Sequence, residues 1–145
     1  MQINTWEAVY FDHNIDTFKN MIDKANELGI ERFVLDDGWF KGRNHERAGL
    51  GDWFVDKNKY SQGLRPLVDY TLAKSLEFGL WFEPEMVNLD SDLYRNHPEW
   101  ILALPEYTQK LGRYQFVLNL ANKDAYNYIL ECISDILNEY QISVS

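Results

Sequence analysis

Apolar residues recur along the chain at spacings that predict alternating helices and strands. Between Asn14 and Gly29 they advance by three or four positions, which predicts a helix with Asn14 as its N-cap and Gly29 at its end. The short run over 32–35 is typical of a parallel strand buried on both faces. A further amphipathic helix is predicted from the cap Asn122 to Tyr140.

Two further strands and a helix are expected from residue preferences and breaker residues. Aromatic and β-branched residues over 5–11 predict a first strand. Pro66 suits the first turn of a helix, which is expected to end at Gly79, directly before a strand over 80–82. The inward stripe of that helix is expected to consist of Leu67, Val68, Leu72 and Leu76.

Longer polar stretches lie between these elements. The stretch over 40–63 is too long for a simple connection, and loops of this length are usually functional or disordered. The aromatic residues in and beside it favour order: Trp39, Phe40, Trp53 and Phe54. A short helix broken by Pro98 is predicted over 91–100, and an extended stretch over 115–119.

Alternation of strands and helices predicts an α/β fold with parallel strands joined by crossover helices. In such folds the active site lies at the carboxyl ends of the strands. A complete (β/α)₈ TIM barrel takes about 250 residues, whereas this chain of 145 residues supplies about three strand–helix units. We therefore expect residues 1–145 to be a single incomplete domain, the first part of a partial TIM barrel.

Composition and charge exclude several classes of protein. The formal net charge of −9 and the absence of a basic stripe argue against a nucleic-acid partner. No apolar run is long enough to span a membrane and no signal peptide is recognised, so a cytoplasmic location is expected. The single cysteine, Cys132, permits no internal disulfide and is expected to be a buried apolar group. Aromatic residues make up 15% of the chain, which together with abundant carboxylates suits sugar binding.

Acidic pairs follow two of the predicted strands. Asp36 and Asp37 could bind hydroxyls, hold a metal or act as acid and base, although a turn at Asp37 would also explain them. Glu83 and Glu85 flank a proline and would point the same way in an extended chain. They could be glycosidase carboxylates or ligands of a divalent cation, or alternatively a cap or an ion pair below the site.

Other candidates are weaker on spacing alone. Trp6 and Trp81 lie in predicted strands. A tryptophan in a strand is more often a core residue than a surface for ligand binding. Arg113 could be a surface charge or a fork-shaped donor to hydroxyls. The histidines have no zinc-site spacing, and no phosphate loop or nucleophile elbow is present, so neither a metal nor a cofactor is expected.

Five segments carry a resemblance to a known enzyme family. They read NTWEAVYF over 4–11, FVLDDGWF over 33–40, LGDWF over 50–54, GLWFEPEMV over 79–87 and SDLYRNHPEW over 91–100. In this order they resemble bacterial α-galactosidases of glycoside hydrolase family 36, in the first part of the catalytic barrel. The resemblance implies that the preceding β-rich domain, the rest of the barrel and the C-terminal β domain are absent here.

The resemblance assigns roles to single residues. Asp36 and Asp37 match an aspartate pair that binds the galactose hydroxyls O4 and O6. Trp81 matches a tryptophan lining the galactose pocket, and Trp6 an aromatic residue near the aglycone. Arg113 matches an arginine of the substrate pocket.

The resemblance assigns no catalytic residue to this chain. In the family the nucleophile and the acid/base are aspartates of later strands. The nucleophile follows a strand whose first residues resemble Ile142 and Ser143, and the chain departs from the family's pattern at Val144 and Ser145. Both catalytic groups are therefore expected beyond Ser145.

The leading hypothesis is therefore that the chain is part of a retaining α-galactosidase acting on melibiose- or raffinose-type galactosides. Its expected partners are the α-galactoside and, for the full-length enzyme, further copies of itself. Two rivals remain. The chain could be a free-standing galactose-binding module or an inert truncated product. It could also belong to a metal-dependent barrel enzyme, with Asp36, Asp37, Glu83 and Glu85 as oxygen ligands.

Overall fold

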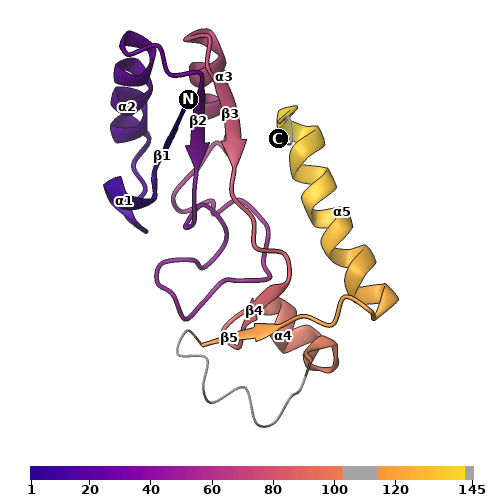
Figure 1. Cartoon of the computed structure of the whole chain (residues 1–145). Helices are drawn as coiled ribbons and strands as arrows, with labels where there is room; N and C mark the ends of the chain where they lie inside the picture. The colour runs from indigo at the N-terminus through magenta and orange to yellow at the C-terminus, as the bar shows by residue number, and fades with distance from the viewer. Residues whose placement is uncertain (103–113, 143–145) are drawn as a thin grey trace.

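Three parallel strands form the main sheet, in the order β1-β2-β3. A computed structural model describes residues 1–102 and 114–142 of the chain (Figure 1). The strands of this sheet are β1 (Gln2–Asn4), β2 (Arg32–Leu35) and β3 (Glu77–Leu80). Val34 lies in the centre of the sheet, paired with Asn4 on one side and Gly79 on the other.

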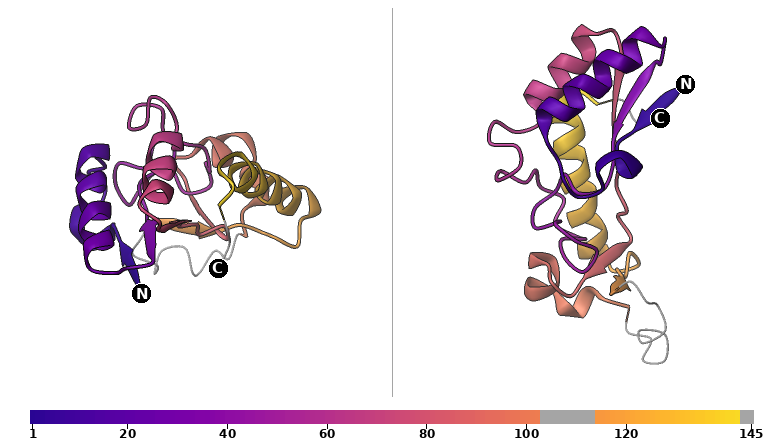
Figure 2. Two further views of the ribbon diagram at one scale, coloured as in Figure 1. Left: turned by 90° about the horizontal axis from the view of Figure 1, so that it is seen from above. Right: turned by 90° about the vertical axis from the view of Figure 1, so that its left-hand side faces the viewer.

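Helices connect these strands and cover one side of the sheet. The helical elements are α1 (Trp6–Val9), α2 (Ile15–Glu27), α3 (Arg65–Ala73), α4 (Asp92–Asn96), the 3₁₀ helix η1 (Pro98–Trp100) and α5 (Lys123–Tyr140). Along the chain α2 joins β1 to β2 and α3 joins β2 to β3. Seen from above, α2, α3 and α5 stand on the same side of the strands (Figure 2). The predicted parallel strands with crossover helices are thus confirmed for β1 to β3.

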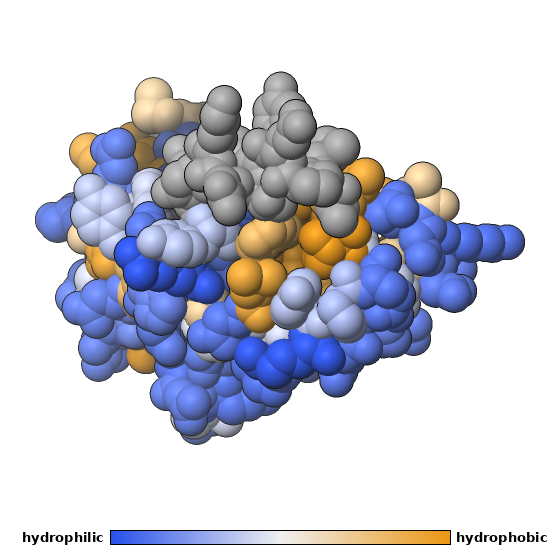
Figure 3. Space-filling view, turned by 90° about the horizontal axis from the view of Figure 1, so that it is seen from below, coloured by the Kyte–Doolittle hydropathy of each residue, from blue (hydrophilic) through white to orange (hydrophobic). Residues whose placement is uncertain are grey.

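A second, smaller sheet lies beyond the carboxyl ends of the main strands. It pairs β4 (Met86–Asn88) with β5 (Gln115–Val117) in antiparallel fashion and lies beside α4 at the lower end of Figure 1. The predicted extended stretch at 115–119 and the helix interrupted before Pro98 are both present. Figure 3, which views this end, shows apolar side chains gathered beside the residues drawn in grey.

The two predicted amphipathic helices begin at their expected caps. The side chain of Asn14 accepts hydrogen bonds from the backbone of Asp16 and Thr17 at the start of α2. Asn122 does the same for the first turn of α5. The buried side chains of α2 are Phe18, Ile22 and Ala25, and those of α5 are Ala125, Ile129, Cys132, Ile136 and Tyr140. The expectation that Cys132 is buried is therefore confirmed.

The predicted strand over 5–11 is wrong. The first strand ends at Asn4, and the chain then turns into α1. The side-chain oxygen of Asn4 accepts a hydrogen bond from the backbone of Trp6 at 2.7 Å, while the backbone of Thr5 still donates to Val34 at 3.2 Å. The aromatic residues of this segment line a cavity instead of a sheet, so strand preference was misleading here.

The boundary predicted at Gly79 is also wrong. Helix α3 ends at Ala73 and the chain reverses at Ser75, whose φ is +63°. Gly79 lies within β3, where a Cβ atom would meet the Cγ2 atom of Val34 at 3.2 Å. The glycine therefore gives room to a neighbouring strand and does not end a helix. Leu72, expected on the inward stripe, is 54% exposed.

The segment between β2 and α3 is ordered by its aromatic residues, as expected. Trp39, Phe40 and Trp53 are fully buried, whereas Phe54 lies at the surface. The rings of Phe40 and Trp53 have centroids 4.6 Å apart. This buried cluster holds the long loop against the carboxyl ends of β2 and β3. The fold is thus mixed α/β with parallel strands, and none of the helices described here is long and apolar enough to cross a membrane.

Candidate functional site

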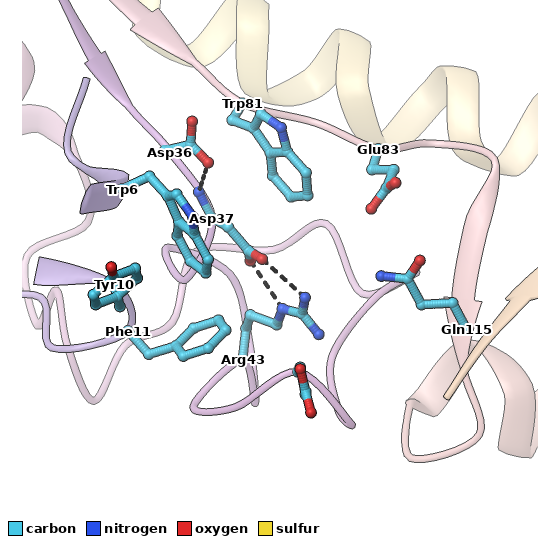
Figure 4. Close-up of a pocket in the computed structure, with 10 residues that line it drawn as sticks. Trp6, Tyr10, Phe11, Asp36, Asp37, Arg43, Trp81, Glu83 and Gln115 are labelled. Atoms are coloured by element: carbon cyan, nitrogen blue, oxygen red, sulfur yellow. Dashed lines mark hydrogen bonds and ion pairs between the residues drawn. The ribbon is translucent and has the colours of Figure 1, made fainter. Parts of the chain in front are cut away.

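A cavity of about 610 Å³ opens at the carboxyl ends of the three parallel strands (Figure 4). Four of the five predicted site residues line it, contributed by the ends of β1, β2 and β3. The lining residues are Trp6, Tyr10, Phe11, Asp36, Asp37, Arg43, Glu46, Trp81, Glu83 and Gln115. The candidate side chains that follow these strands therefore lie together at the carboxyl edge of the sheet, as expected.

Two positions named by the sequence lie outside the described residues. The first is Arg113, the fifth predicted binding residue. The second is Ser145, beyond which the nucleophile and the acid/base are expected. The role of Arg113 and the place of the two catalytic groups therefore stay predictions.

Asp36, which directly follows β2, is held by residues at and just after the end of β1. Its backbone N–H donates to the hydroxyl of Thr5 at 3.0 Å. Its carboxylate accepts hydrogen bonds from the side chain of Asn4 and, at 2.6 Å, from the backbone of Asp37. The side chain remains partly exposed on the cavity wall, so it presents an oriented acceptor to a ligand.

Asp37 is held by an arginine that the sequence did not single out. Nε and Nη2 of Arg43 donate to the two carboxylate oxygens of Asp37, each at 2.8 Å. Both residues are nearly fully buried, so this ion pair is shielded from solvent. Paired forks of this kind fix direction as well as charge. The orientation of the Asp37 carboxylate is therefore set before any ligand binds.

The side chains of Lys59 and His13 hold the backbone at and after Asp37 by hydrogen bonds. Nζ of Lys59 donates to the backbone oxygens of Gly38 and Arg43, both at 2.7 Å. His13 contacts the backbone oxygen of Asp37 at 3.0 Å. Burial is the main cause that lowers the pKa of His13, to about 4, and the charge of Lys59 adds to it. Burial likewise lowers the pKa of Lys59.

Gly38 is the point where this turn depends on glycine. Its φ is +109°, which side chains rarely allow, and a Cβ atom there would lie 2.8 Å from Nε2 of His13. A turn at this position was one of the two interpretations of the sequence. The turn and the cavity-lining carboxylates are thus both present.

Aromatic side chains form two walls of the cavity on either side of Asp36 (Figure 4). Trp81 is stacked on Phe40 with centroids 6.3 Å apart, and its backbone oxygen accepts from Nε1 of Trp39 at 2.9 Å. On the other side Trp6 meets Phe11 edge to face at 5.2 Å. Both tryptophans are only half-buried, so each presents ring surface to the cavity as well as to the core.

The two glutamates after β3 differ in their surroundings. Glu83 lines the cavity, whereas Glu85 is exposed and is not among the lining residues. Within residues 1–102 and 114–142 no group of three or more His, Cys, Asp or Glu side chains could hold a metal ion. The rival in which these glutamates join Asp36 and Asp37 around a cation gains no support from this geometry.

The cavity combines acceptors, donors and apolar rings. Four carboxylates and one guanidinium line it, so its field is negative and disfavours anionic ligands. A neutral, polyhydroxylated ring fits this chemistry, because its hydroxyls can donate to carboxylates while its C–H faces contact aromatic rings. A developing positive charge on such a ring would also be stabilised.

Sequence reasoning missed Arg43, Asn88 and Gln115 among the residues that build the site. Arg43 and Asn88 form a hydrogen bond of 3.2 Å between positions 45 residues apart. No local pattern links them. The signal available was an arginine within a loop already expected to be ordered, and such a charge needs a partner when it is buried.

Comparison with known proteins decides the family. The model of the family described as Melibiase matches residues 1–144. The chain belongs to the melibiase family. Over 142 residues the chain is 51% identical to an α-galactosidase of Escherichia coli, and the match covers 98% of the chain and 20% of that relative. It is 48% identical to the α-galactosidase AgaA of Geobacillus stearothermophilus over 93% of the chain and 18% of that enzyme.

Solved structures agree with this assignment. A GH36 α-galactosidase AgaA variant from G. stearothermophilus, in complex with 1-deoxygalactonojirimycin, superimposes with a TM-score of 0.91 at 45% identity. Another AgaA variant, in complex with raffinose, also gives 0.91 at 45% identity. In both cases the match covers 99% of this chain and 20% of the other. The expected resemblance to family 36 is confirmed, and the chain spans about a fifth of the length of its relatives.

Proposed function

We propose that this chain is part of a retaining α-galactosidase and supplies the residues that bind the galactosyl ring. In this proposal residues 1–145 form one incomplete domain, the first part of a (β/α)₈ barrel. Trp6, Asp36, Asp37 and Trp81 bind the sugar. The substrates are melibiose- or raffinose-type α-galactosides, and the two catalytic carboxylates come from later parts of the barrel.

The observation that carries the proposal is the convergence of these four side chains on one cavity. They come from the ends of three strands, yet all line the same space of about 610 Å³. The likeness to AgaA structures that hold 1-deoxygalactonojirimycin and raffinose supports a galactoside as the ligand. The negative field of the cavity also suits the positive charge that develops on the sugar ring during glycoside hydrolysis.

In this mechanism the described residues bind and orient, and other groups cleave. A retaining enzyme needs a nucleophile and an acid/base about 5 Å apart on either side of the scissile bond. The carboxylates of Asp36 and Asp37 accept hydrogen bonds from ring hydroxyls, and the rings of Trp6 and Trp81 exclude water from its faces. These contacts accelerate the reaction only as far as they strengthen in the oxocarbenium-like transition state.

The test uses a complete enzyme that contains this segment. In a chimera, residues 1–142 replace the matching segment of the E. coli α-galactosidase, which supplies the remaining parts. We expect the chimera to hydrolyse p-nitrophenyl α-galactoside and raffinose. Asp37→Asn should lower kcat/KM by about 100-fold or more, because it removes a charged acceptor and breaks the fork with Arg43. Steady-state kinetics with a count of active sites measures this.

The control is Asp69→Asn, on an exposed position of α3 far from the cavity, which should keep the kinetics of the unsubstituted chimera. Near-normal kcat/KM in Asp37→Asn would remove Asp37 from the site. An unsubstituted chimera that folds but does not hydrolyse α-galactosides would overturn the assignment as part of an enzyme. Saturable galactose binding by the 145-residue chain, without hydrolysis in the chimera, would favour a binding module instead.

A further inference from the structure

Asn88, the last residue of β4, is fully buried and uses its whole side-chain amide. Its oxygen accepts hydrogen bonds from the backbone of Leu50 at 2.8 Å and from Nη1 of Arg43 at 3.2 Å. Its nitrogen donates to the backbone oxygens of Glu46 at 3.3 Å and Tyr114 at 3.1 Å. A flipped amide would set donors against donors and acceptors against acceptors, so this side chain has one orientation.

That orientation is passed on to Arg43. The two N–H groups of Nη1 donate to the oxygen of Asn88 and to the backbone oxygen of Ala48 at 3.0 Å. The guanidinium is planar and rigid, so fixing one edge fixes the other. The opposite edge carries the fork to Asp37. The three side chains therefore form a buried relay from the small antiparallel sheet to the cavity wall.

The fork leaves Asp37 able to bind a ligand. Each carboxylate oxygen has two acceptor sites, and the fork occupies one on each. Two further hydrogen bonds from sugar hydroxyls can therefore be accepted in a single, preset direction. Such preorganisation removes the loss of side-chain freedom from the cost of binding.

We propose that Asn88 and Arg43 are positioning residues: they hold the Asp37 carboxylate in the one orientation that receives the hydroxyls of the galactosyl ring. This inference rests on the proposed function and names the residues through which Asp37 acts. The rest of the fold offers a contrast. Arg95 also contacts two carboxylates, of Asp90 and Asp92, but all three side chains are half exposed. An exposed pair of this kind contributes little to stability.

The test compares matched substitutions in the chimera. Arg43→Lys keeps the charge and removes the fork, and should lower kcat/KM by about 100-fold, because a small misplacement of a binding group costs this much. Asn88→Ala leaves the fork unanchored and should lower kcat/KM by about tenfold. Arg95→Lys makes the same exchange at an exposed pair and should change neither kcat nor KM. The inhibition constant for galactose should rise in the first two variants and not in the third.

Two further readouts separate positioning from a merely structural role. In an Asp37→Asn background, Arg43→Lys should lower kcat/KM by a further factor of less than about three, because the carboxylate that Arg43 positions is already lost. In Arg43→Ala, added guanidinium ion should restore part of kcat/KM at concentrations where the same ionic strength of sodium chloride does not. A structural role predicts instead a lower count of active sites, unchanged KM, full additivity and no rescue.

The outcomes distinguish this inference from the proposed function. If the unsubstituted chimera is active and Asp37→Asn impairs it, but Arg43→Lys and Asn88→Ala are normal or impair it additively, the positioning relay is wrong and the proposed function stands. If the unsubstituted chimera folds without binding galactose or hydrolysing galactosides, the proposed function fails. Poor folding of Arg43→Lys does not block the decision, because Asn88→Ala and the guanidinium rescue of Arg43→Ala test the same relay.

Discussion

The two ring nitrogens of His13 face partners that fix the position of its proton. Nε2 contacts the backbone oxygen of Asp37, which only accepts, so Nε2 carries the hydrogen. In the neutral ring Nδ1 is then the acceptor for the hydroxyl of Tyr60 at 2.6 Å. Burial, which dominates, and the charge of Lys59 lower the pKa of His13 to about 4. The neutral ring is therefore part of the folded state near neutral pH.

We expect the free energy of unfolding to fall as the pH falls from about 6.5 to about 4. Unfolded His13 takes up a proton near its ordinary pKa of 6.5, whereas the folded chain resists protonation until about 4. Within this window the unfolded state binds more protons and is stabilised. The full loss is about 3 kcal/mol. Urea titrations of the chain in dilute solution, followed by tryptophan fluorescence, measure it.

His13→Gln is the matched variant, because its amide can still donate to the Asp37 oxygen but does not titrate. Its stability should change less with pH over the same window. If the variant and the original chain lost stability equally between pH 6.5 and 4, the titration of His13 would not be the cause.

At this scale the sequence predicted side chains that line the cavity better than the side chains that hold them in place. Asp36, Asp37 and Trp81 follow strands directly, and a resemblance to a family named their roles. Arg43 could not be placed, because its partners are fixed by a loop whose path depends on buried rings. Arg113, also predicted, stays a prediction.

At the scale of elements, helices with local signals were predicted well. Both α2 and α5 combine a periodic apolar face with an asparagine cap, and both signals lie within a few residues of one another. The segment over 5–11 and Gly79 were misinterpreted, because their conformation depends on residues from other parts of the chain: aromatic residues of the segment line the cavity, and Gly79 lies against Val34. Local residue preferences contain no information about such long-range contacts.

The cap of α5 gives a prediction about helix stability. Asn122→Ala removes the acceptor for the backbone N–H groups of Asp124 and Ala125, and should lower the free energy of unfolding by about 1 kcal/mol. Asn26→Ala, at an exposed position inside α2, is the control and should be neutral or slightly stabilising. Urea titration in dilute solution measures both. Equal effects of the two substitutions would contradict a capping role.

At the scale of the whole molecule, the described residues cover the main sheet on one side only. Helices α2, α3 and α5 stand on that side (Figure 2). A hollow of about 440 Å³ is lined by Val34, Leu80, Phe82, Ile133 and Leu137, among others. In the described part of the chain β1 and β3 each pair only with β2, so both have an open edge. Open edges beside apolar surface favour association between chains.

We therefore expect the 145-residue chain to associate as its concentration rises. Light scattering should give masses above the monomer value of 17.2 kDa at high concentration and approach that value on dilution. Val34→Lys, which places a charge in the centre of this sheet and in the hollow, should weaken the association. A constant monomer mass at every concentration would show that the open sheet does not drive self-contact.

The aromatic cluster behind the cavity also gives the molecule an optical property. The rings of Trp39 and Trp53 lie 6.2 Å apart, and those of Trp53 and Trp81 are separated by the same distance. Indoles this close exchange excitation energy before they emit. Excitation energy absorbed by Trp39 and Trp53 can therefore be transferred to Trp81, which lines the cavity. We expect the fluorescence of these three tryptophans to respond to a ligand in the cavity.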